Sequence, residues 1–370
     1  LQLQLQQPRG VRRRHVEAAR RVRPQDPHGD RRPRPRAVIA RSGREPVSYG
    51  SVARDQLPVL IEAFEALKAI KDPRIAAKLI GEHRLTHEMV PGELKQSPEV
   101  WAALVPHMPL TALVRSLGKL SQVGVIAPFS SATKHVLAQL GSIDKLRKAR
   151  LHPLAMLTAL RVYAQGHGER GKLSWVPVDK IVDALDQAFY ACFENVEPTG
   201  KRTLLALDVS GSMGCGTIGG LPGVTPAVGS AAMAMVTLKA EAEVQTLAFS
   251  TTIREARISG KQRLDDVVKH LARIPMGGTD CAQPMLWALE KRVPIDVFQV
   301  YTDNETWYGQ IHPHEALRRY REKLGIPAKL VVVGMTATKF SIADPDDAGM
   351  LDVVGFDSAA PAIMADFARG

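Results

Sequence analysis

The spacing of hydrophobic residues divides the chain into two regions with different periods. Between residues 54 and 195, apolar residues recur at the 3.6-residue spacing of a helix, as at Leu57, Leu60 and Phe64. Beyond residue 202, short apolar segments of strand length alternate with helical segments. The hydrophobic pattern therefore predicts an all-helical part followed by an α/β part.

The helical region predicts a series of short helices, joined by short connections that contain Pro, Gly or Ser. We expect these helices over residues 57–70, 73–80, 98–105, 110–121, 131–140, 153–165 and 178–193. Short helices with short connections pack as helical hairpins, each of which buries its apolar face on the next. The region thus indicates a HEAT-like α-solenoid with a degenerate repeat.

The second region predicts a doubly wound α/β domain. We expect strands over residues 203–208, 244–249, 296–301 and 329–334, and helices over 225–241, 264–273, 281–291, 313–324 and near 361. This alternation gives a mostly parallel sheet with helices on both faces. The fold class is therefore α plus α/β, with domains at 47–200 and 201–370 after an Arg- and Pro-rich segment at 1–46.

The segment TLLALDVSGSMG combines a buried strand with a loop of oxygen donors. Asp208 ends the strand, and Ser210 and Ser212 follow at a spacing of two residues. Ligands of open α/β sheets bind outside the carboxyl ends of the strands. One carboxylate and two hydroxyls are hard donors that suit Mg²⁺ or Mn²⁺ better than zinc. The alternative interpretation is a strand-end turn whose hydroxyls cap backbone groups.

Two later segments complete a set of metal ligands. Thr279 lies in the segment GGTD, and Asp303 lies in TDNE after an apolar run. Together with Asp208, Ser210 and Ser212, they resemble the metal-ion-dependent adhesion site (MIDAS) of von Willebrand factor A domains. This resemblance implies a bound divalent cation, for which we expect Mg²⁺ with Mn²⁺ as the alternative. Because few of the ligands are charged, the ion would keep water or accept an acidic group from a partner.

The composition is that of a globular protein, with 45% hydrophobic and 24% charged residues. No apolar run approaches the 18 residues of a membrane span, and the N-terminal segment is polar where a signal peptide is apolar. The three cysteines lack CxxC spacing, and their odd number argues against a disulfide framework. We therefore expect a cytoplasmic protein without membrane association, in which Cys215 and Cys281 are packing residues.

The net charge of +11 comes mostly from the N-terminal segment. Residues 1–45 hold 13 arginines, no lysine and four acidic residues, which suits a disordered arm that contacts phosphates. The sequence also lacks an initiating Met, and Arg-rich sequence without lysine is typical of an out-of-frame or truncated GC-rich reading frame. We therefore expect truncation or an artefact here, and we assign the segment no function.

A second basic stretch lies within the helical region. Residues 134–172 hold eight basic and two acidic residues and end in the glycine-rich GHGERGK. The stretch suits a phosphate backbone, although a solvated helix face is the commoner explanation for such charge. His83 and His87 have the i, i+4 spacing of zinc ligands but not the HExxH pattern. We expect ordinary histidines there, able to contact phosphates or bases beside Arg84.

Longer segments of both regions resemble one protein family. These are EHRLTHEMVP (82–91), SPEVWAALVPHMPLTALVRSLGKL (97–120), KARLHPLAMLTALRVYAQGHGERGKLSW (148–175) and DALDQAFYACFENVEPTGKR (183–202), followed by DVSGSM, GGTDC and YTDNET. Together they resemble the TROVE-module RNA-binding family, founded by the Ro (SS-A) autoantigen, including its bacterial members. The resemblance covers residues 47–370 almost without gaps.

The resemblance implies a monomeric RNA-binding protein of RNA quality control that is not an enzyme. In that family a ring of helical repeats is closed by the A domain. Small noncoding Y RNAs bind the basic outer surface, and single-stranded 3′ ends of misfolded RNAs enter the central hole. Carried over to the matching segments of this chain, the expected RNA contacts are Arg84, His87, Arg115, Lys119, Arg150, Arg170 and Lys172.

The family's module begins well upstream of the position of Tyr49, so we expect a chain shortened at its N-terminus, with a ring that cannot close and a reduced RNA surface. Two other classes of function stay open. The A domain alone would permit a protein-binding adhesion module. An aspartyl-phosphate enzyme would need Asp in place of Ser210, a GxSxG elbow would need glycines in place of Asp208 and Ser212, and no P-loop is present. Catalysis is the least expected of the three.

Overall fold

The computed structural model describes residues 37–39, 47–48, 58–168, 172–219, 221, 223–303, 309–336, 342–356 and 359–370. The described residues belong to two compact units, one ending at Val136 and the other comprising Leu137–Gly370. This division falls inside a helix, whereas the sequence places a linker near residue 200. In the described part of the chain, no helix has the length and apolarity that a membrane crossing requires.

The first unit is a stack of short helices. A short antiparallel pair of strands, β1 (Ala37–Ile39) and β2 (Val47–Ser48), also belongs to this part of the chain. The helices are α2 (Val59–Ala69), α3 (Pro73–His83), η2 (His87–Met89), η3 (Leu94–Gln96), α4 (Pro98–Leu104), η4 (Val105–His107), α5 (Leu110–Gln122) and the first part of α6 (Ser131–Leu140). The predicted helices of this unit are confirmed.

Local sequence explains where these helices begin and which face they bury. Asp72 caps α3, because its side chain accepts a hydrogen bond from the backbone N of Arg74 at 2.8 Å. On α5, Leu113, Leu117 and Leu120 are buried at helical spacing. The opposite face of α5 is thereby left for polar and charged side chains.

The second unit begins with helices that pack as a hairpin. These are α7 (Ile143–Lys148), α8 (Pro153–Ala164), α9 (Asp179–Ala191) and η5 (Cys192–Asn195). The backbone N of Val178 donates to the hydroxyl of Tyr163 at 3.2 Å, which fixes the start of α9 on α8. The sequence did not predict α7, because most of its six residues are charged and Leu146 alone is buried.

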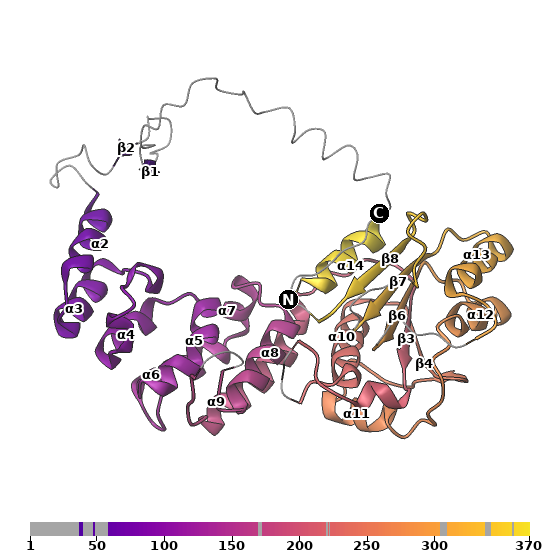
Figure 1. Ribbon diagram of the computed structural model, residues 1–370, viewed down its shortest axis with the longest axis horizontal. Helices are drawn as coiled ribbons and strands as arrows, with labels where there is room; N and C mark the ends of the chain where they lie inside the picture. The colour runs from indigo at the N-terminus through magenta and orange to yellow at the C-terminus, as the bar shows by residue number, and fades with distance from the viewer. Residues whose placement is uncertain are drawn as a thin grey trace. The chain divides into compact units, whose positions relative to one another are not determined.

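The α/β part of the second unit contains a six-stranded sheet (Figure 1). Its elements are β3 (Thr203–Asp208), η6 (Gly211–Gly214), α10 (Pro226–Ala240), β4 (Val244–Phe249), β5 (Ile253–Glu255), α11 (Leu264–Leu271), α12 (Gln283–Glu290), β6 (Val297–Thr302), α13 (Pro313–Leu324), β7 (Lys329–Gly334), β8 (Met350–Val354) and α14 (Ala360–Arg369). The strand order is β5-β4-β3-β6-β7-β8, and every neighbouring pair is parallel except β4 with β5. The predicted doubly wound fold is confirmed.

The sequence missed two strands. The edge strand β5 has three residues, which is too few to give a period. In β8 the apolar run is interrupted by Asp352, which is 5% exposed. Both strands lie at the edges of the sheet, so the central arrangement follows the prediction.

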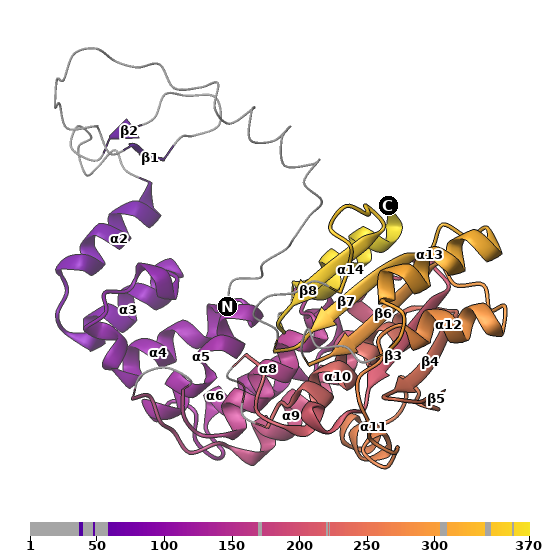
Figure 2. The same ribbon diagram turned by 45° about the vertical axis from the view of Figure 1, so that its right-hand side comes forward.

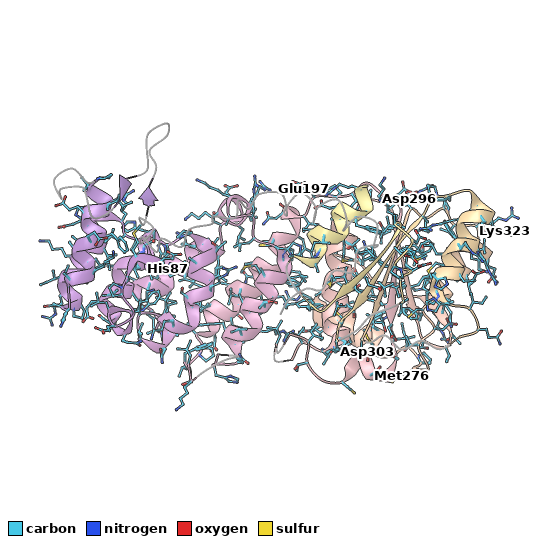
Figure 3. The ribbon with its side chains drawn as sticks, turned by 45° about the horizontal axis from the view of Figure 1, so that its top comes forward. His87, Glu197, Met276, Asp296, Asp303 and Lys323 are labelled. Carbon is cyan, nitrogen blue, oxygen red and sulfur yellow. The ribbon has the colours of Figure 1, made fainter. Side chains whose placement is uncertain are left out.

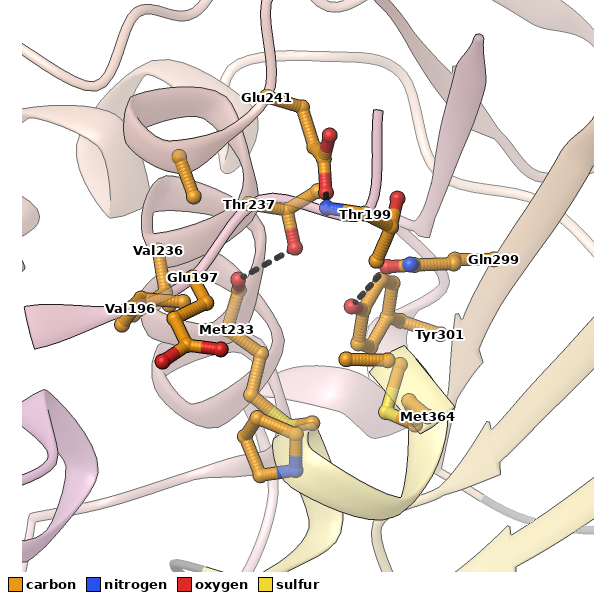
Figure 4. A pocket seen from close by; sticks show the side chains of 13 residues that line it. Val196, Glu197, Thr199, Met233, Val236, Thr237, Glu241, Gln299, Tyr301 and Met364 are labelled. Atoms are coloured by element: carbon orange, nitrogen blue, oxygen red, sulfur yellow. Dashed lines mark hydrogen bonds between the residues drawn. The ribbon is translucent and has the colours of Figure 1, made fainter. Parts of the chain in front are cut away.

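Helices cover both faces of the sheet, as Figure 2 shows from a second side. Phe298 and Val300 face the apolar core that α12 and α13 complete. The alternate side chains of β6, Gln299 and Tyr301, face a cavity of about 40 Å³ bordered by α10 and α14 (Figure 4). There the Tyr301 hydroxyl donates to Gln299 Oε1 at 2.8 Å, which satisfies both buried groups. The strand β6 is therefore held firmly from both sides.

The register between β3 and β6 places two polar residues at one edge of the sheet. Leu207 of β3 lies opposite Tyr301 of β6, so Asp208 and Thr302 end neighbouring strands at the same level. The chain leaves β3 towards β4 on one side and leaves β6 towards β7 on the other. This is the topological switch point at which open α/β sheets bind ligands.

We predict that Tyr320→Phe destabilises the protein by roughly 1–3 kcal/mol, the cost of leaving buried polar groups unpaired. The Tyr320 hydroxyl accepts from Ile295 N at 2.6 Å and donates to Val293 O at 2.8 Å, just before β6 begins. The ring packing against Phe298 is retained in the variant. Chemical denaturation measures the change, and an unaltered midpoint would contradict the assignment.

We predict a pH-dependent stability that originates at Asp352. Burial raises the pKa of Asp352 to about 7 from the ordinary 3.8. Because the folded form binds this proton more tightly, the stabilisation is fully present below pH 3.8 and is lost as the pH rises through 7, by at most about 4 kcal/mol. Asp352→Asn keeps an acceptor for Ala343 N and removes the charge. The variant should gain stability relative to the wild type between pH 5 and pH 8, measured by urea denaturation; a constant difference would refute the assignment.

Candidate functional site

Asp208 is a buried carboxylate at the end of the central strand β3, with 3% of its surface exposed. Its Oδ1 accepts from the backbone N of Ser210 at 2.8 Å, and its Oδ2 accepts from Thr302 Oγ1 at 2.8 Å. Removal from water is the main cause that raises the pKa of Asp208. A carboxylate has about four lone pairs, so these two bonds leave capacity for a further ligand.

The two serines of the segment DVSGS lie side by side. Ser210 Oγ and Ser212 Oγ are 3.2 Å apart, which is close enough for both to bind one ion. Ser210 is buried, whereas Ser212 is exposed at the start of η6. The structure therefore brings Asp208, Ser210 and Ser212 together as predicted, with Ser212 towards solvent.

Thr279 belongs to a loop that is fastened to the end of β4. The backbone N of Asp280 donates to Ser250 O at 3.2 Å, and Gln283 Nε2 donates to Thr251 O at 2.7 Å. Gly277 lies so close to Thr251 that a Cβ there would come within 2.3 Å of Thr251 Oγ1. Since β4 is the neighbour of β3, this loop lies at the same edge of the sheet as Asp208.

Asp303 directly follows β6 and is held by the end of β7. Its carbonyl oxygen accepts from the backbone N and the hydroxyl of Thr336 at 2.8 and 2.6 Å. Asp208 ends β3 and Asp303 follows the neighbouring strand β6, so both carboxylates lie at one edge of the sheet. Besides burial, the charge of Asp303 raises the pKa of Asp208. Figure 3 shows Asp303 and Met276 at one end of the domain and Asp296 at the other.

Cys281 is a buried thiol that feels the charges of three carboxylates. Burial, and then the charges of Asp208, Asp280 and Asp303, raise the pKa of its thiol well above the ordinary value. Cys281 is fully buried, as expected of a packing residue. The same expectation for Cys215 is wrong, because Cys215 is exposed and its Sγ donates to Gly211 O at 3.6 Å.

The donor set fits a divalent cation. No described Lys or Arg forms an ion pair with Asp208 or Asp303, so the buried negative charge has no such partner among the described residues. Among the described residues there is no group of three or more His, Cys, Asp or Glu that could hold a metal. The candidate site depends on hydroxyl and carboxylate oxygens, which are the ligands of Mg²⁺ rather than of zinc.

Sequence reasoning missed Thr302 as a partner of Asp208. In the sequence, Thr302 is an ordinary residue at the end of a predicted strand. Only the pairing of β3 with β6 brings its hydroxyl to Asp208. The signal that could have identified it is a hydroxyl directly before Asp303 on an adjacent strand. Thr302 fixes the orientation of the carboxylate, as partners of metal ligands commonly do.

Four of the expected RNA contacts lie in the first unit. Arg115 is exposed on α5, and Lys119 lies one turn further along, so both side chains share one helix face. Lys119 Nζ donates to Gln96 Oε1 at 2.7 Å and to Gln122 Oε1 at 2.8 Å. The bond to Gln96 ties α5 to the connection between α3 and α4, in which Arg84 and His87 lie.

The remaining expected contacts are less well defined. Arg84 is exposed and ends α3 in a left-handed conformation, and His87 Nδ1 is 3.1 Å from Glu88 Oε2. Arg150 and Lys172 are exposed in the second unit. Arg170 lies outside the described residues. The structure thus groups Arg115 with Lys119 on one face of α5.

Two family models match the chain, the TROVE domain over residues 65–161 and the Ro60 vWA domain over residues 202–368. The chain is similar to RNA-binding protein RO60 of Deinococcus radiodurans, with 49% identity over 80% of this chain and 56% of the relative. It is also similar to RNA-binding protein RO60 of Caenorhabditis elegans, with 42% identity over 84% of this chain and 48% of the relative. The chain therefore spans about half the length of these relatives.

A solved structure shares the fold. The crystal structure of Deinococcus radiodurans RO (RSR) protein matches with a TM-score of 0.80 and 47% identity, over 84% of this chain and 63% of that one. The match supports the order of a helical part followed by an A domain. With a TROVE domain and a Ro60 vWA domain in one chain, this protein belongs to the Ro family of TROVE-module proteins.

Proposed function

We propose that this protein binds RNA through its helical surface and holds Mg²⁺ in its A domain. The observation that carries the RNA part is the pair Arg115 and Lys119, presented on one face of α5 and tied through Gln96 to the connection that bears Arg84 and His87. Cations on one face suit the phosphate backbone of RNA. The relatives named RNA-binding protein RO60 support the same function.

The proposed RNA ligands are small noncoding Y-like RNAs and the single-stranded 3′ ends of misfolded RNAs. Contacts to the shape and the backbone suit structured RNA, whereas a basic central hole, as in the ring of helical repeats described for the family, selects an unpaired strand. We propose a role in RNA quality control as a monomeric, cytoplasmic protein that is not an enzyme. Three free thiols support the cytoplasmic location.

In the A domain, Asp208, Ser210, Ser212, Thr279 and Asp303 would hold the cation. Bound there, Mg²⁺ would balance the buried carboxylates and offer a coordination position to a partner group. Mn²⁺ is the alternative ion. The second candidate function is the binding of a protein partner at this coordination position. It is supported by the exposure of Ser212 and by Met276, which is 65% exposed beside Gly211.

We predict that Arg115→Ala combined with Lys119→Ala weakens RNA binding and flattens its salt dependence. Removing one cation from a phosphate lowers the slope of log Kd against log salt by ~1. Filter binding at several salt concentrations, with structured RNA with and without a single-stranded 3′ tail, measures both quantities.

The matched control is Lys291→Ala with Lys323→Ala, which removes the same charge from exposed positions of the A domain. This pair should leave the slope unchanged. Equal affinity and slope for all three proteins would exclude Arg115 and Lys119 as phosphate-binding residues.

We predict that Asp208→Asn abolishes divalent-metal binding and that Thr302→Val weakens it by about 10- to 100-fold, the usual effect of losing a partner of a metal ligand. Mn²⁺ serves as the probe in a titration followed by electron paramagnetic resonance, and Mg²⁺ should displace it. Ser259→Ala, at an exposed serine between β5 and α11, is the control. If Asp208→Asn bound Mn²⁺ as tightly as the control, the proposed site would be wrong.

A further inference from the structure

The turn that joins α7 to α8 (Figure 1) presents three exposed cations. Lys145 and Lys148 lie one helical turn apart on α7, and Arg150 follows two residues after the helix. Within the described part of the chain, none of these three side chains takes part in an ion pair. Their neighbour Arg147 differs, because it pairs with Glu194 Oε2 at 3.1 Å. We call Lys145, Lys148 and Arg150 the basic corner.

The backbone of the basic corner is fixed by a side chain from η5. Asn195 Nδ2 donates to Leu146 O at 3.2 Å and to Leu151 O at 2.8 Å, and so bonds both sides of the turn. Leu146 and Leu151 are buried, and Leu151 N donates to Leu146 O at 3.4 Å. Arg150 N donates to Arg147 O at 2.9 Å. The exposed cations are therefore carried by a backbone with a defined conformation.

Cations at the end of a helix often serve only to cap its unpaired carbonyl groups. In α7 these carbonyl groups already have donors. Lys145 O accepts from Ala149 N at 2.9 Å, and Leu146 O and Arg147 O accept the hydrogen bonds given above. The hydrogen bonding of the helix end is thus complete without the side chains of the basic corner, which leaves them available to a ligand.

The backbone conformation of Arg150 has a counterpart in the A domain. Arg150 has a φ of +49°, in the left-handed region that glycine usually occupies after a helix. Arg292 has a φ of +53° after α12, where its backbone N donates to Leu289 O at 3.2 Å. The two turns differ in charge, because Lys291 beside Arg292 pairs with Glu290 at 3.0 Å. The conformation is therefore shared, and the unbalanced charge distinguishes the basic corner.

The composition of the basic corner favours the backbone of double-stranded RNA. Residues 141–151 include four basic residues, one acidic residue and no aromatic residue. Single strands are held largely by stacking on aromatic rings, whereas a duplex is bound through its phosphates and its shape. His152 adds no charge, because burial lowers the pKa of its imidazole to about 4. The corner thus offers cations for phosphates and no aromatic platform for bases.

We propose that the basic corner binds the phosphate backbone of a double-stranded RNA stem, in addition to the contact at Arg115 and Lys119. The proposal rests on the proposed RNA-binding function and deepens it, since it assigns a form of RNA to Lys145, Lys148 and Arg150. Arg115 and Lys119 belong to the first compact unit and the basic corner to the second, so each can be altered without the other. Phosphate contacts carry no sequence information, so unrelated stems should bind equally.

The test uses the full chain and a fluorescein-labelled RNA duplex of about 16 base pairs, a length that modules for duplex RNA span. A second duplex of unrelated sequence and one separated strand of the first serve as comparisons. Fluorescence anisotropy at several salt concentrations gives Kd and its salt dependence.

Three variants are compared with the wild type, namely Lys145→Ala with Lys148→Ala, Arg150→Gly, and the triple variant that combines all three changes. The matched control is Arg292→Gly, which removes one exposed cation from the same backbone conformation.

We expect the triple variant to raise Kd for both duplexes at least about tenfold and to lower the slope of log Kd against log salt by roughly 2–3, because each lost phosphate contact lowers it by about 0.9. The single strand should lose less affinity than the duplexes. Arg150→Gly should lower the slope by about 1, yet melt at or above the wild-type temperature, because glycine adopts this φ without strain. Arg292→Gly should melt in the same way and leave the slope unchanged.

Four outcomes would overturn the inference. Equal duplex affinity and slope for the triple variant and the wild type would exclude the basic corner, while the proposed function stands if Arg115→Ala with Lys119→Ala still weakens binding. A loss for the single strand as large as that for the duplexes would exclude a double-stranded stem as the ligand. A lower melting temperature in Arg150→Gly but not in Arg292→Gly would mean that the Arg150 side chain stabilises the fold. If the wild-type chain bound neither form of RNA, both the proposed function and this inference would fail.

Discussion

The hydrogen bond from Thr302 to Asp208 joins the two central strands where the connections of the sheet diverge. A carboxylate buried there is costly unless its oxygens are satisfied, and the backbone of Ser210 and the hydroxyl of Thr302 supply neutral donors. Neutral donors orient the carboxylate without cancelling its charge. The charge therefore remains available for a cation, and the loops bearing Thr279 and Asp303 are fastened around it by neighbouring strand ends.

Much of this arrangement follows from sequence, because apolar strands of a parallel sheet end at one edge and the polar residues after them must gather there. That logic predicted β3, β4, β6 and β7 and the grouping of Asp208 with Ser210 and Ser212. It failed for β8, where Asp352 is buried within the strand. It also failed for α7, because most of its residues are charged and the single buried residue, Leu146, gives no apolar period. Thr302 was also missed, because its role depends on the register between two strands.

The proposed nucleic-acid surface was less predictable than the proposed metal site. The sequence identifies basic residues but not the helix faces that they share. The hydrogen bond from Lys119 to Gln96 joins residues 23 positions apart, and no sequence pattern predicted it. Residue type gives the chemistry of a surface, and packing decides which residues present it.

The last helices of the solenoid belong physically to the A domain. Arg263 at the start of α11 bonds Asp186 Oδ2 at 2.7 Å and stacks on Tyr190, whose hydroxyl accepts from Leu264 N at 2.9 Å. The ion pair is partly exposed and contributes little by itself, but the ring of Tyr190 packs with Phe189 and Phe193 in one aromatic cluster. Separating the chain near residue 200 would expose this cluster and leave Leu264 N without its acceptor. The sheet that carries Asp208 and the helices α8 and α9 therefore pack as one body.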